Sequence, residues 1–467
     1  MSINPILYFK DFYFLFFVTY SFVLASLNVL AVSNPLYGYL AILLFHVVAA
    51  ITLIHGKQLS LLVLLLFITL GTEIGGAVTT DFSSDFTMIN VSSARVPFLD
   101  ISLAILYSLV LTVWVLFSHK ISAKNLITVL AILPSIFTLG LINPIGQLFH
   151  SIQIVIMLIM GYLFGPYLFT QRAVRTILVC VWVTFICFGV ASILGYQRPY
   201  SVESFAFTGG FHNYIFLLPF LTFHSFRNQG LAFCGVLIAY FSSGFLISGK
   251  IIVTFIISLI CLLGYRLGAI LFSCLCFSLF SGQFIQITAD FLVSSGNIIA
   301  GEKLRQLDLM TNLYMIPEKI FYNSSAGNII AEATTLGRHI LFEGYLLGTG
   351  LGASLPDYYG YLSLANDGAY PAQEFDARAM SRMHVAIFNF ILWFGFVAII
   401  LATYLMRKAA SFGPLAVTCL VFSMIYATTK FDLIVFGALI YFLLSPKSHS
   451  FTTRNKLRLL DYKSSID

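Results

Sequence analysis

Long apolar runs joined by short polar connections make up most of the chain, and one long segment breaks this pattern. At residues 289–383 charged and polar residues are frequent, and apolar runs lie on both sides of this segment. An apolar run of ~20 residues crosses the ~30 Å hydrocarbon layer of a bilayer as a helix, because a helix satisfies its own backbone hydrogen bonds in lipid. The pattern therefore predicts a membrane protein whose one long polar segment lies in a single aqueous compartment.

The apolar runs predict about 14 transmembrane helices, with a range of about 12 to 14 because several runs are closely joined. The runs are continuously apolar and show no period of two, which excludes a transmembrane β-barrel. The fold class is therefore an all-α integral membrane protein with one long, partly helical outer loop. The expected spans are 12–32, 36–54, 59–78, 98–117, 126–143, 150–170, 176–195, 211–225, 231–247, 251–265, 268–288, 384–406, 414–428 and 430–444.

Four parts follow from these spans, and the long loop has a pattern of its own. N-terminal helices occupy 1–288, the loop domain 289–383, C-terminal helices 384–445 and a basic tail 446–467. Within the loop, residues 302–322 and 327–345 have apolar positions at mixed spacings of three and four, which predicts amphipathic helices on the membrane face. The run 347–375, rich in Gly, Tyr, Asp and Ala, has no such period and is expected to be irregular.

Lysine and arginine residues indicate which side of the membrane each connection faces, because short cytoplasmic loops are enriched in both. With a cytoplasmic N-terminus, 15 of the 25 basic residues lie inside, but only Asp11, Asp461 and Asp467 of the 19 acidic residues do. Both termini are therefore expected in the cytoplasm and the long loop outside. The inside basic residues are Lys10, Lys57, Lys120, Lys124, Arg172, Arg175, Arg227, Arg266, Arg407, Lys408, Lys447, Arg454, Lys456, Arg458 and Lys463.

Composition agrees with this class and excludes others. The chain of 467 residues is 59% hydrophobic and 9% charged, with a mean hydropathy of +0.94, so it has too few charges for a soluble surface. The net charge of +6 is explained by a cytoplasmic tail that meets anionic lipid, and no nucleic-acid partner is expected. All seven cysteines lie in predicted spans, which predicts no disulfide framework and no thiolate metal site in the loop.

Positively charged residues on the outer side are the first candidate chemistry. Guanidinium groups bind phosphoryl oxygens bidentately and stabilise the charge that develops when pyrophosphate leaves. His384, at the head of the span after the loop, is placed to take a proton from a sugar hydroxyl. These residue types fit a lipid-linked pyrophosphate. Six of the ten outer cations belong to the candidate set: Arg95, Arg198, Lys250, Arg338, Arg378 and Arg382.

Four other residues complete the candidate set. Glu73 lies near the outer end of a span, where a carboxylate needs either a function or a structural arginine partner. Asn213 follows a glycine pair at the start of a span and is expected just inside the membrane. Gly348 and Gly350 belong to a Gly-Thr-Gly-Leu-Gly run that no strand precedes, so a tight turn beside the substrate is favoured over a nucleotide loop. For Lys250, an anion ligand and snorkelling to lipid headgroups both stay open.

Several motifs occur in a characteristic order across residues 196–400. Arg198 precedes Gly209-Gly210-Phe211-His212-Asn213, and Leu246-Ile247-Ser248-Gly249-Lys250 follows; Arg338 then stands ten residues before Gly348, and His384 opens a span that contains Gly395. In this order and spacing the chain resembles the O-antigen ligase and polymerase superfamily. Two positions depart from the family pattern. Lys250 stands where an arginine is often found, and Val385 follows the histidine in place of an asparagine, the nearest being Asn389.

The resemblance implies an inverting, metal-independent glycosyltransferase at the periplasmic face of the bacterial inner membrane. Its expected donor is an undecaprenyl-pyrophosphate-linked oligosaccharide, with membrane lipid and a chain-length regulator protein as further partners and no cofactor. Residues assigned to catalysis are Arg338, His384, Arg198 and Lys250. Residues assigned to substrate binding are Arg95, Asn213, Gly348, Gly350, Arg378, Arg382 and Glu73, and no metal ligand is assigned.

Within the superfamily, about fourteen spans and a very apolar, aromatic-rich chain favour a Wzy-type O-antigen polymerase over an O-antigen ligase. A transporter, such as a flippase for the lipid-linked sugar, is the competing class. Transporters tend to place charges near the midplane and to show two related halves, neither of which is evident in this sequence. A structural or receptor role is the third alternative.

Overall fold

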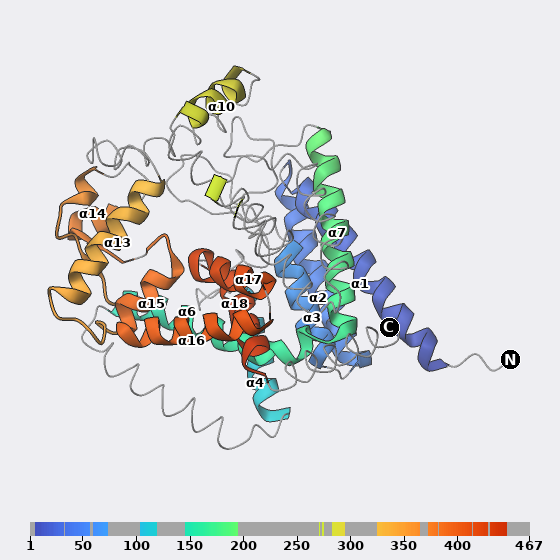
Figure 1. Ribbon diagram of the computed structural model, residues 1–467. Helices are drawn as coiled ribbons and strands as arrows, with labels where there is room; N and C mark the ends of the chain where they lie inside the picture. Colours follow the sequence, from blue (N-terminus) through green and yellow to red (C-terminus); the bar gives the residue numbers. More distant parts are fainter. Residues whose placement is uncertain are drawn as a thin grey trace, which may run out of the picture. The chain divides into compact units, whose positions relative to one another are not determined.

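The computed structural model describes residues 5–31, 33–56, 59–72, 103–118, 145–194, 270, 273–274, 283–294, 325–364, 372–381, 383–412, 414–427 and 430–445. Helices predominate among them (Figure 1). The chain divides into two compact units, one of Met1–Lys120, Leu158–Phe255 and Gly437–Asp467, the other of Ile121–Met157 and Ile256–Phe436. Each unit is described by itself.

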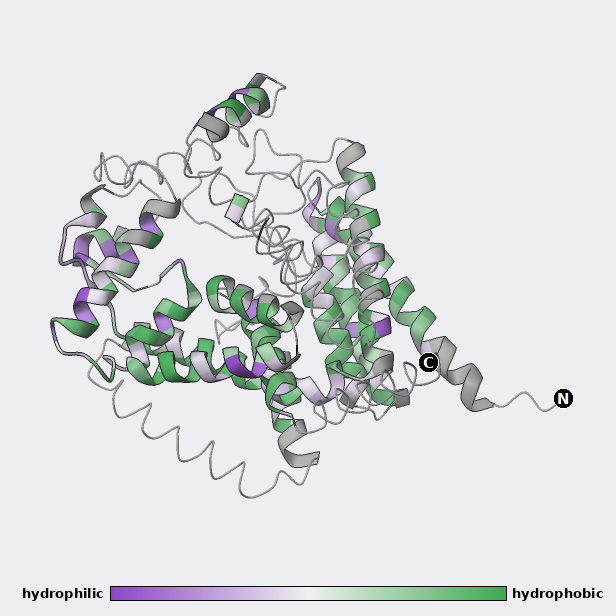
Figure 2. Ribbon diagram, viewed as in Figure 1, coloured by the Kyte–Doolittle hydropathy of each residue, from purple (hydrophilic) through white to green (hydrophobic). Residues whose placement is uncertain are grey.

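Helices of the first unit follow the predicted N-terminal spans closely. In the described part, four helices are long and apolar enough to cross a membrane, with apolar stretches at Tyr13–Leu30, Pro35–Ile54, Ser151–Leu168 and Ala173–Ala191. Figure 2 shows that most residues of these helices are hydrophobic. The helices are α1 (Pro5–Leu30), α2 (Pro35–Gly56), α3 (Leu59–Thr72), α4 (Leu103–Ser118), the second half of α6 (Ile145–Leu168), α7 (Gln171–Ile193) and the end of α18 (Lys430–Leu444).

Small polar side chains join these helices inside the unit. The Tyr20 and Thr69 hydroxyls are 2.6 Å apart between α1 and α3. Ser21 Oγ donates to the Cys180 carbonyl oxygen of α7 at 3.2 Å, and both residues are buried. Without water to compete, such interhelical hydrogen bonds hold apolar helices in a defined pairing.

Glycine allows α6 and α18 to approach closely. A Cβ atom on Gly437 would lie 2.0 Å from the Leu158 carbonyl oxygen, and one on Gly165 would lie 2.4 Å from the Tyr441 ring. Neither position has room for a side chain, so the two backbones meet where glycine permits it.

The second unit contains the described part of the long loop together with C-terminal helices. Its elements are the first half of α6, α10 (Gln283–Ser294), α13 (Ser325–Leu341), β1 (Leu355–Pro356), η3 (Tyr361–Leu364), α14 (Ala372–Ala377), β2 (Ala379–Met380), α15 (Ala386–Phe394), α16 (Phe396–Phe412), α17 (Pro414–Tyr426) and the start of α18. β1 and β2 pair antiparallel, with Leu355 opposite Met380.

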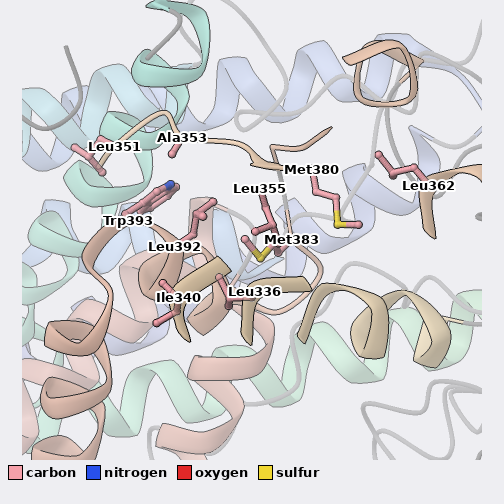
Figure 3. Close-up of a cluster of buried hydrophobic side chains, with 10 residues drawn as sticks. All are labelled: Leu336, Ile340, Leu351, Ala353, Leu355, Leu362, Met380, Met383, Leu392 and Trp393. Carbon is pink, nitrogen blue, oxygen red and sulfur yellow. The ribbon is translucent and has the colours of Figure 1, made fainter. Parts of the chain in front are cut away.

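One apolar cluster holds this unit together (Figure 3). Residues of α13, of the turns after it, of β2 and of α15 converge, and most are nearly or fully buried. The members are Leu336, Ile340, Leu351, Ala353, Leu355, Leu362, Met380, Met383, Leu392 and Trp393. The polar segment is therefore fixed to the C-terminal helices by a core of its own.

Several elements differ from the predicted boundaries. Helix α1 begins seven residues before its predicted span, and α6 and α7 each begin five residues before theirs. The expected span 384–406 is broken at Gly395, whose φ of 55° and ψ of −134° end α15 and start α16. A Cβ atom there would lie 2.1 Å from the Leu346 carbonyl oxygen. The loop backbone therefore contacts the helix backbone at Gly395, where no side chain is in the way. Helix α10 runs six residues past the predicted end of its span at 288, to Ser294.

Other described helices agree with the prediction. Helix α13 covers most of the amphipathic helix expected at 327–345. In the described part of the stretch expected to be irregular, 347–375, turns surround the two-residue strand β1 and the short helix η3, and α14 begins near its end. The expected helix 302–322 and the expected spans 126–143, 211–225, 231–247 and 251–265 lie outside the described residues.

Candidate functional site

Helix α13 supplies the centre of the candidate site through an unusual buried face. Leu336 and Ile340 enter the apolar core, as the three-and-four spacing predicts. Beside them on the same side, Glu332, Thr335 and His339 are also buried, at 0%, 0% and 3% exposure. Half of the buried face is thus polar. Burial of a polar group lowers the free energy of unfolding unless the group forms a hydrogen bond or an ion pair.

Glu332 holds His384. Its Oε1 atom lies 2.6 Å from His384 Nδ1, and its two oxygens accept the His384 backbone N–H at 3.0 and 2.9 Å. The carboxylate is fully buried, whereas a third of the His384 side chain is exposed. One buried carboxylate therefore fixes both the backbone and the ring of a partly exposed histidine.

Asn389 fixes the residue before this histidine. Its side-chain oxygen accepts the Met383 N–H at 3.2 Å, and its amide nitrogen donates to the Met383 carbonyl at 3.3 Å. Asn389, in the first turn of α15, thus holds the backbone next to His384.

Arg338 lies on another face of α13, within a cage of two tyrosines and a glutamate. Its Nε atom is 3.2 Å from Glu343 Oε1, and its guanidinium carbon lies 5.0 and 5.2 Å from the Tyr358 and Tyr359 ring centroids. The hydrogen bond with Glu343 raises the pKa of Arg338 above its ordinary value. The guanidinium is exposed and held in place, as binding of an anion from solvent requires.

His339 links this cage to the interior. Its Nδ1 atom is 2.7 Å from the Tyr358 hydroxyl, and its ring stacks on Tyr345 at 4.3 Å between centroids. Burial lowers the pKa of His339, with a smaller opposing effect from Glu343. Among the described residues, its Nε2 atom and the Thr335 hydroxyl are buried without a hydrogen-bond partner.

The glycine turn supports the helix that follows His384. Thr349 and Gly350 donate their backbone N–H groups to the Leu392 and Trp393 carbonyl oxygens at 2.9 and 3.1 Å. Gly348 has a φ of 82°, and a Cβ atom there would lie 2.5 Å from the Trp393 backbone. Thr349 and Gly350 therefore cap the carboxyl end of α15, and Gly348 allows the turn to approach it closely, structural roles that the sequence did not reveal.

The structure brings only part of the predicted site together. Arg338 and Glu332 both lie on α13, six residues apart, which is about 9 Å along the helix axis. Because Glu332 pairs with His384, α13 positions both Arg338 and His384. Arg378 is exposed, with a φ of 48°, and its carbonyl oxygen accepts the Asp357 N–H at 2.9 Å. Six predicted site residues lie outside the described residues: Arg382, Arg95, Arg198, Asn213, Lys250 and Glu73.

Sequence reasoning missed Glu332, Tyr358 and Tyr359. Glu332 has a signal in the sequence, because it shares a helical face with Leu336 and thus falls on the buried side of an amphipathic helix. A carboxylate at such a position needs a partner. The two tyrosines lie in an irregular turn, where no period indicates which way a side chain points.

The described residues define a mostly helical protein with several helices able to cross a membrane, and with a buried carboxylate–histidine pair beside a caged arginine. No three histidine, cysteine, aspartate or glutamate side chains gather at metal-binding distance within that part of the chain. No protein-family model, no curated protein and no solved structure matches the sequence.

Proposed function

We propose that the protein is an O-antigen polymerase, an inverting and metal-independent glycosyltransferase that joins undecaprenyl-pyrophosphate-linked oligosaccharide units. The observation that supports it best is that the partly exposed His384 pairs with the buried Glu332, which lies on the same helix as Arg338. The resemblance of the sequence motifs supplies the substrate class, and the geometry supplies a base and a cation suited to it.

His384 serves as the general base in this proposal. When Nδ1 carries the ring hydrogen and donates it to Glu332, Nε2 is the basic nitrogen. A buried carboxylate partner keeps the ring in this tautomer and orientation, as in other carboxylate–histidine pairs. The acceptor sugar hydroxyl would transfer its proton to Nε2 as its oxygen attacks the anomeric carbon of the donor.

Arg338 serves the leaving group. Attack from the face opposite the pyrophosphate forms the new glycosidic bond, breaks the bond between the anomeric carbon and the phosphate oxygen, and inverts the anomeric centre. The departing lipid pyrophosphate gains negative charge, which a guanidinium held ready by Glu343 and two tyrosine rings stabilises without reorganisation. Arg198 and Lys250 are proposed to approach the same phosphates from other outer loops.

The proposed location is the bacterial inner membrane, with about fourteen spans, cytoplasmic termini and residues 289–383 in the periplasm. Single cysteines at Ser354 and Ser201 should then react with an impermeant thiol reagent from the periplasm, whereas one at Ser448 should not. The reverse pattern would refute this topology and, with it, the assignment of the site to periplasmic chemistry.

Lipopolysaccharide from a deletion strain tests the function directly. Loss of a polymerase leaves core capped with a single repeat unit, whereas loss of a ligase or flippase leaves unsubstituted core. Arg338→Ala and His384→Ala should reproduce the single-unit pattern at normal protein level, and Arg407→Ala, an exposed arginine of α16, should restore the ladder. A normal ladder in the deletion strain would rule out all three activities.

Purified protein tests the independence from metal. Polymerisation of the lipid-linked unit in lipid nanodiscs should continue after treatment with EDTA, since protein cations neutralise the leaving group. An activity that EDTA removes and magnesium or manganese restores would show that the role assigned to the arginines is wrong.

A further inference from the structure

A short segment after α13 exposes an unusual density of apolar side chains. Leu341 ends the helix, Phe342 comes directly after it, and Tyr345, Leu346 and Leu347 follow within the next five residues. All are exposed, with Phe342 at 83% and Leu347 at 72%. We call Leu341–Leu347 the apolar turn. Contiguous apolar surface of this kind marks contact with another apolar phase or partner.

Helix α16 indicates which partner this is. Val397, Ile400, Leu401 and Tyr404 form an exposed apolar stripe at spacings of three and four, while Ala398, Leu405 and Ala409 are buried on the other side. A helix that is apolar on its buried and its exposed faces alike suits lipid and not water. The charged residues Arg407 and Lys408 appear only near its end.

The apolar turn begins where this stripe begins. The Phe396 N–H, at the start of α16, donates to the Leu346 carbonyl oxygen at 2.9 Å. Gly348 and Gly395 pack with almost no space between the turn and the end of α15, so the turn cannot shift without breaking that junction. The turn is thus fixed at the end of the lipid-facing stripe farther from Arg407 and Lys408.

From this junction we infer that the apolar turn inserts into the membrane boundary and contacts phospholipid acyl chains. Glu343 lies within the turn but pairs with Arg338, and both side chains are about one-third exposed, so their charges can remain among the headgroups while Phe342 and Leu347 enter the apolar layer. The insertion fixes the depth of Arg338 at the level of lipid phosphates. This inference depends only on the protein being in a membrane and does not depend on which reaction the site performs.

Tryptophan fluorescence in brominated lipid tests the insertion. The full-length protein is reconstituted in vesicles of phosphatidylcholine, either unmodified or brominated near the headgroup end or the far end of the acyl chains. Phe342→Trp and Leu347→Trp each add one indole, whose emission is obtained by subtracting the signal of the unchanged protein. Ile400→Trp, in the exposed stripe of α16, is the positive control, and Asp376→Trp, at an exposed charged position of α14, is the negative control.

The expected result is loss of the added emission from Phe342→Trp and Leu347→Trp with shallow bromines, less loss with deep bromines, and none from Asp376→Trp. Quenching of Ile400→Trp alone would overturn the inference, because the turn would then lie in water. Quenching at neither α16 nor the turn would overturn it by removing the lipid contact of α16. Protection from quenching that increases with the protein-to-lipid ratio would also overturn it, in favour of a second copy of the chain.

Discussion

Replacing Glu332 by glutamine tests the proposed base with almost no change in shape. The carboxylate accepts the His384 backbone N–H and meets Nδ1 at 2.6 Å, so it offers acceptor atoms on both sides. Glutamine offers one acceptor oxygen and one NH₂ donor. Oε1 meets both the backbone N–H and Nδ1, and Oε2 meets the backbone N–H alone. If the amide oxygen takes the Oε2 place and keeps the backbone N–H, the NH₂ faces Nδ1, which must then accept. The ring hydrogen moves to Nε2, and the nitrogen that should take the substrate proton is no longer basic.

The size of the effect follows from what is lost. General-base catalysis contributes ~10²- to 10⁴-fold, or about 3–5 kcal/mol of transition-state free energy. Loss of one charge-assisted hydrogen bond costs ~1.5–3 kcal/mol of folding free energy. Glu332→Gln should therefore lower kcat by roughly the base contribution while the protein still inserts and folds. KM for the lipid-linked donor should change little, because the donor phosphates are bound by cations.

The assay is polymerisation by purified protein in nanodiscs, with chain length resolved on gels and protein level measured separately. Asp376→Asn makes the same chemical change at an exposed carboxylate of α14 and should leave the rate unchanged. Glu332→Asp keeps the charge and should retain more activity than Glu332→Gln. A wild-type kcat for Glu332→Gln at normal protein level would refute the role of the pair.

Three further predictions concern the supports of the site. Gly344 and Gly348 have φ values of 84° and 82°, but of the two only Gly348 has other atoms where a Cβ atom would lie. Gly344→Ala should lower stability by the cost of the left-handed backbone alone, ~1–2 kcal/mol. Gly348→Ala should lower the melting temperature much more than Gly344→Ala does. Burial lowers the pKa of His339 in the folded protein, so below pH ~6.5 the unfolded chain binds a proton at this residue more readily than the folded protein does. The melting temperature should therefore decrease as the pH is lowered below ~6.5, and it should decrease less in His339→Phe. Tyr358→Phe keeps the ring at Arg338 but loses the hydrogen bond to His339, so it should retain more activity than Tyr358→Ala, which should lose long chains in the gel assay.

The fold was predictable wherever length and hydrophobicity decide it. The spans expected at 36–54 and 430–444 match α2 and α18 within two residues, and α13 begins two residues before its predicted start. The break at Gly395 was not predictable, because it depends on a loop carbonyl 49 residues earlier in the chain that occupies the place of a side chain. Nothing local in the sequence distinguishes this glycine from one inside a continuous span.

The site was predictable in its charged residues and not in their partners. Arg338 lies on a helix directly before a glycine turn, and His384 stands just before α15, as expected from the order of the sequence. The cage of Tyr358, Tyr359 and Glu343 and the link to Glu332 connect residues 5 to 52 positions apart. Such contacts follow from the packing of the turn on α13, which hydrophobic periodicity does not encode.

The polar half of the buried face of α13 is the strongest argument that this helix does chemistry. A helix needed only to close the apolar core could place leucine or alanine at positions 332, 335 and 339 and gain stability from their burial. Instead a buried glutamate orients His384, and a buried histidine orients the tyrosine ring beneath Arg338. Two of the three buried polar groups, Glu332 and His339, thus support a partly exposed residue of the proposed reaction, directly or through Tyr358. Polar residues at core positions are expected where function matters more than stability. Here the residues that they support, His384 and Arg338, are both partly exposed to solvent.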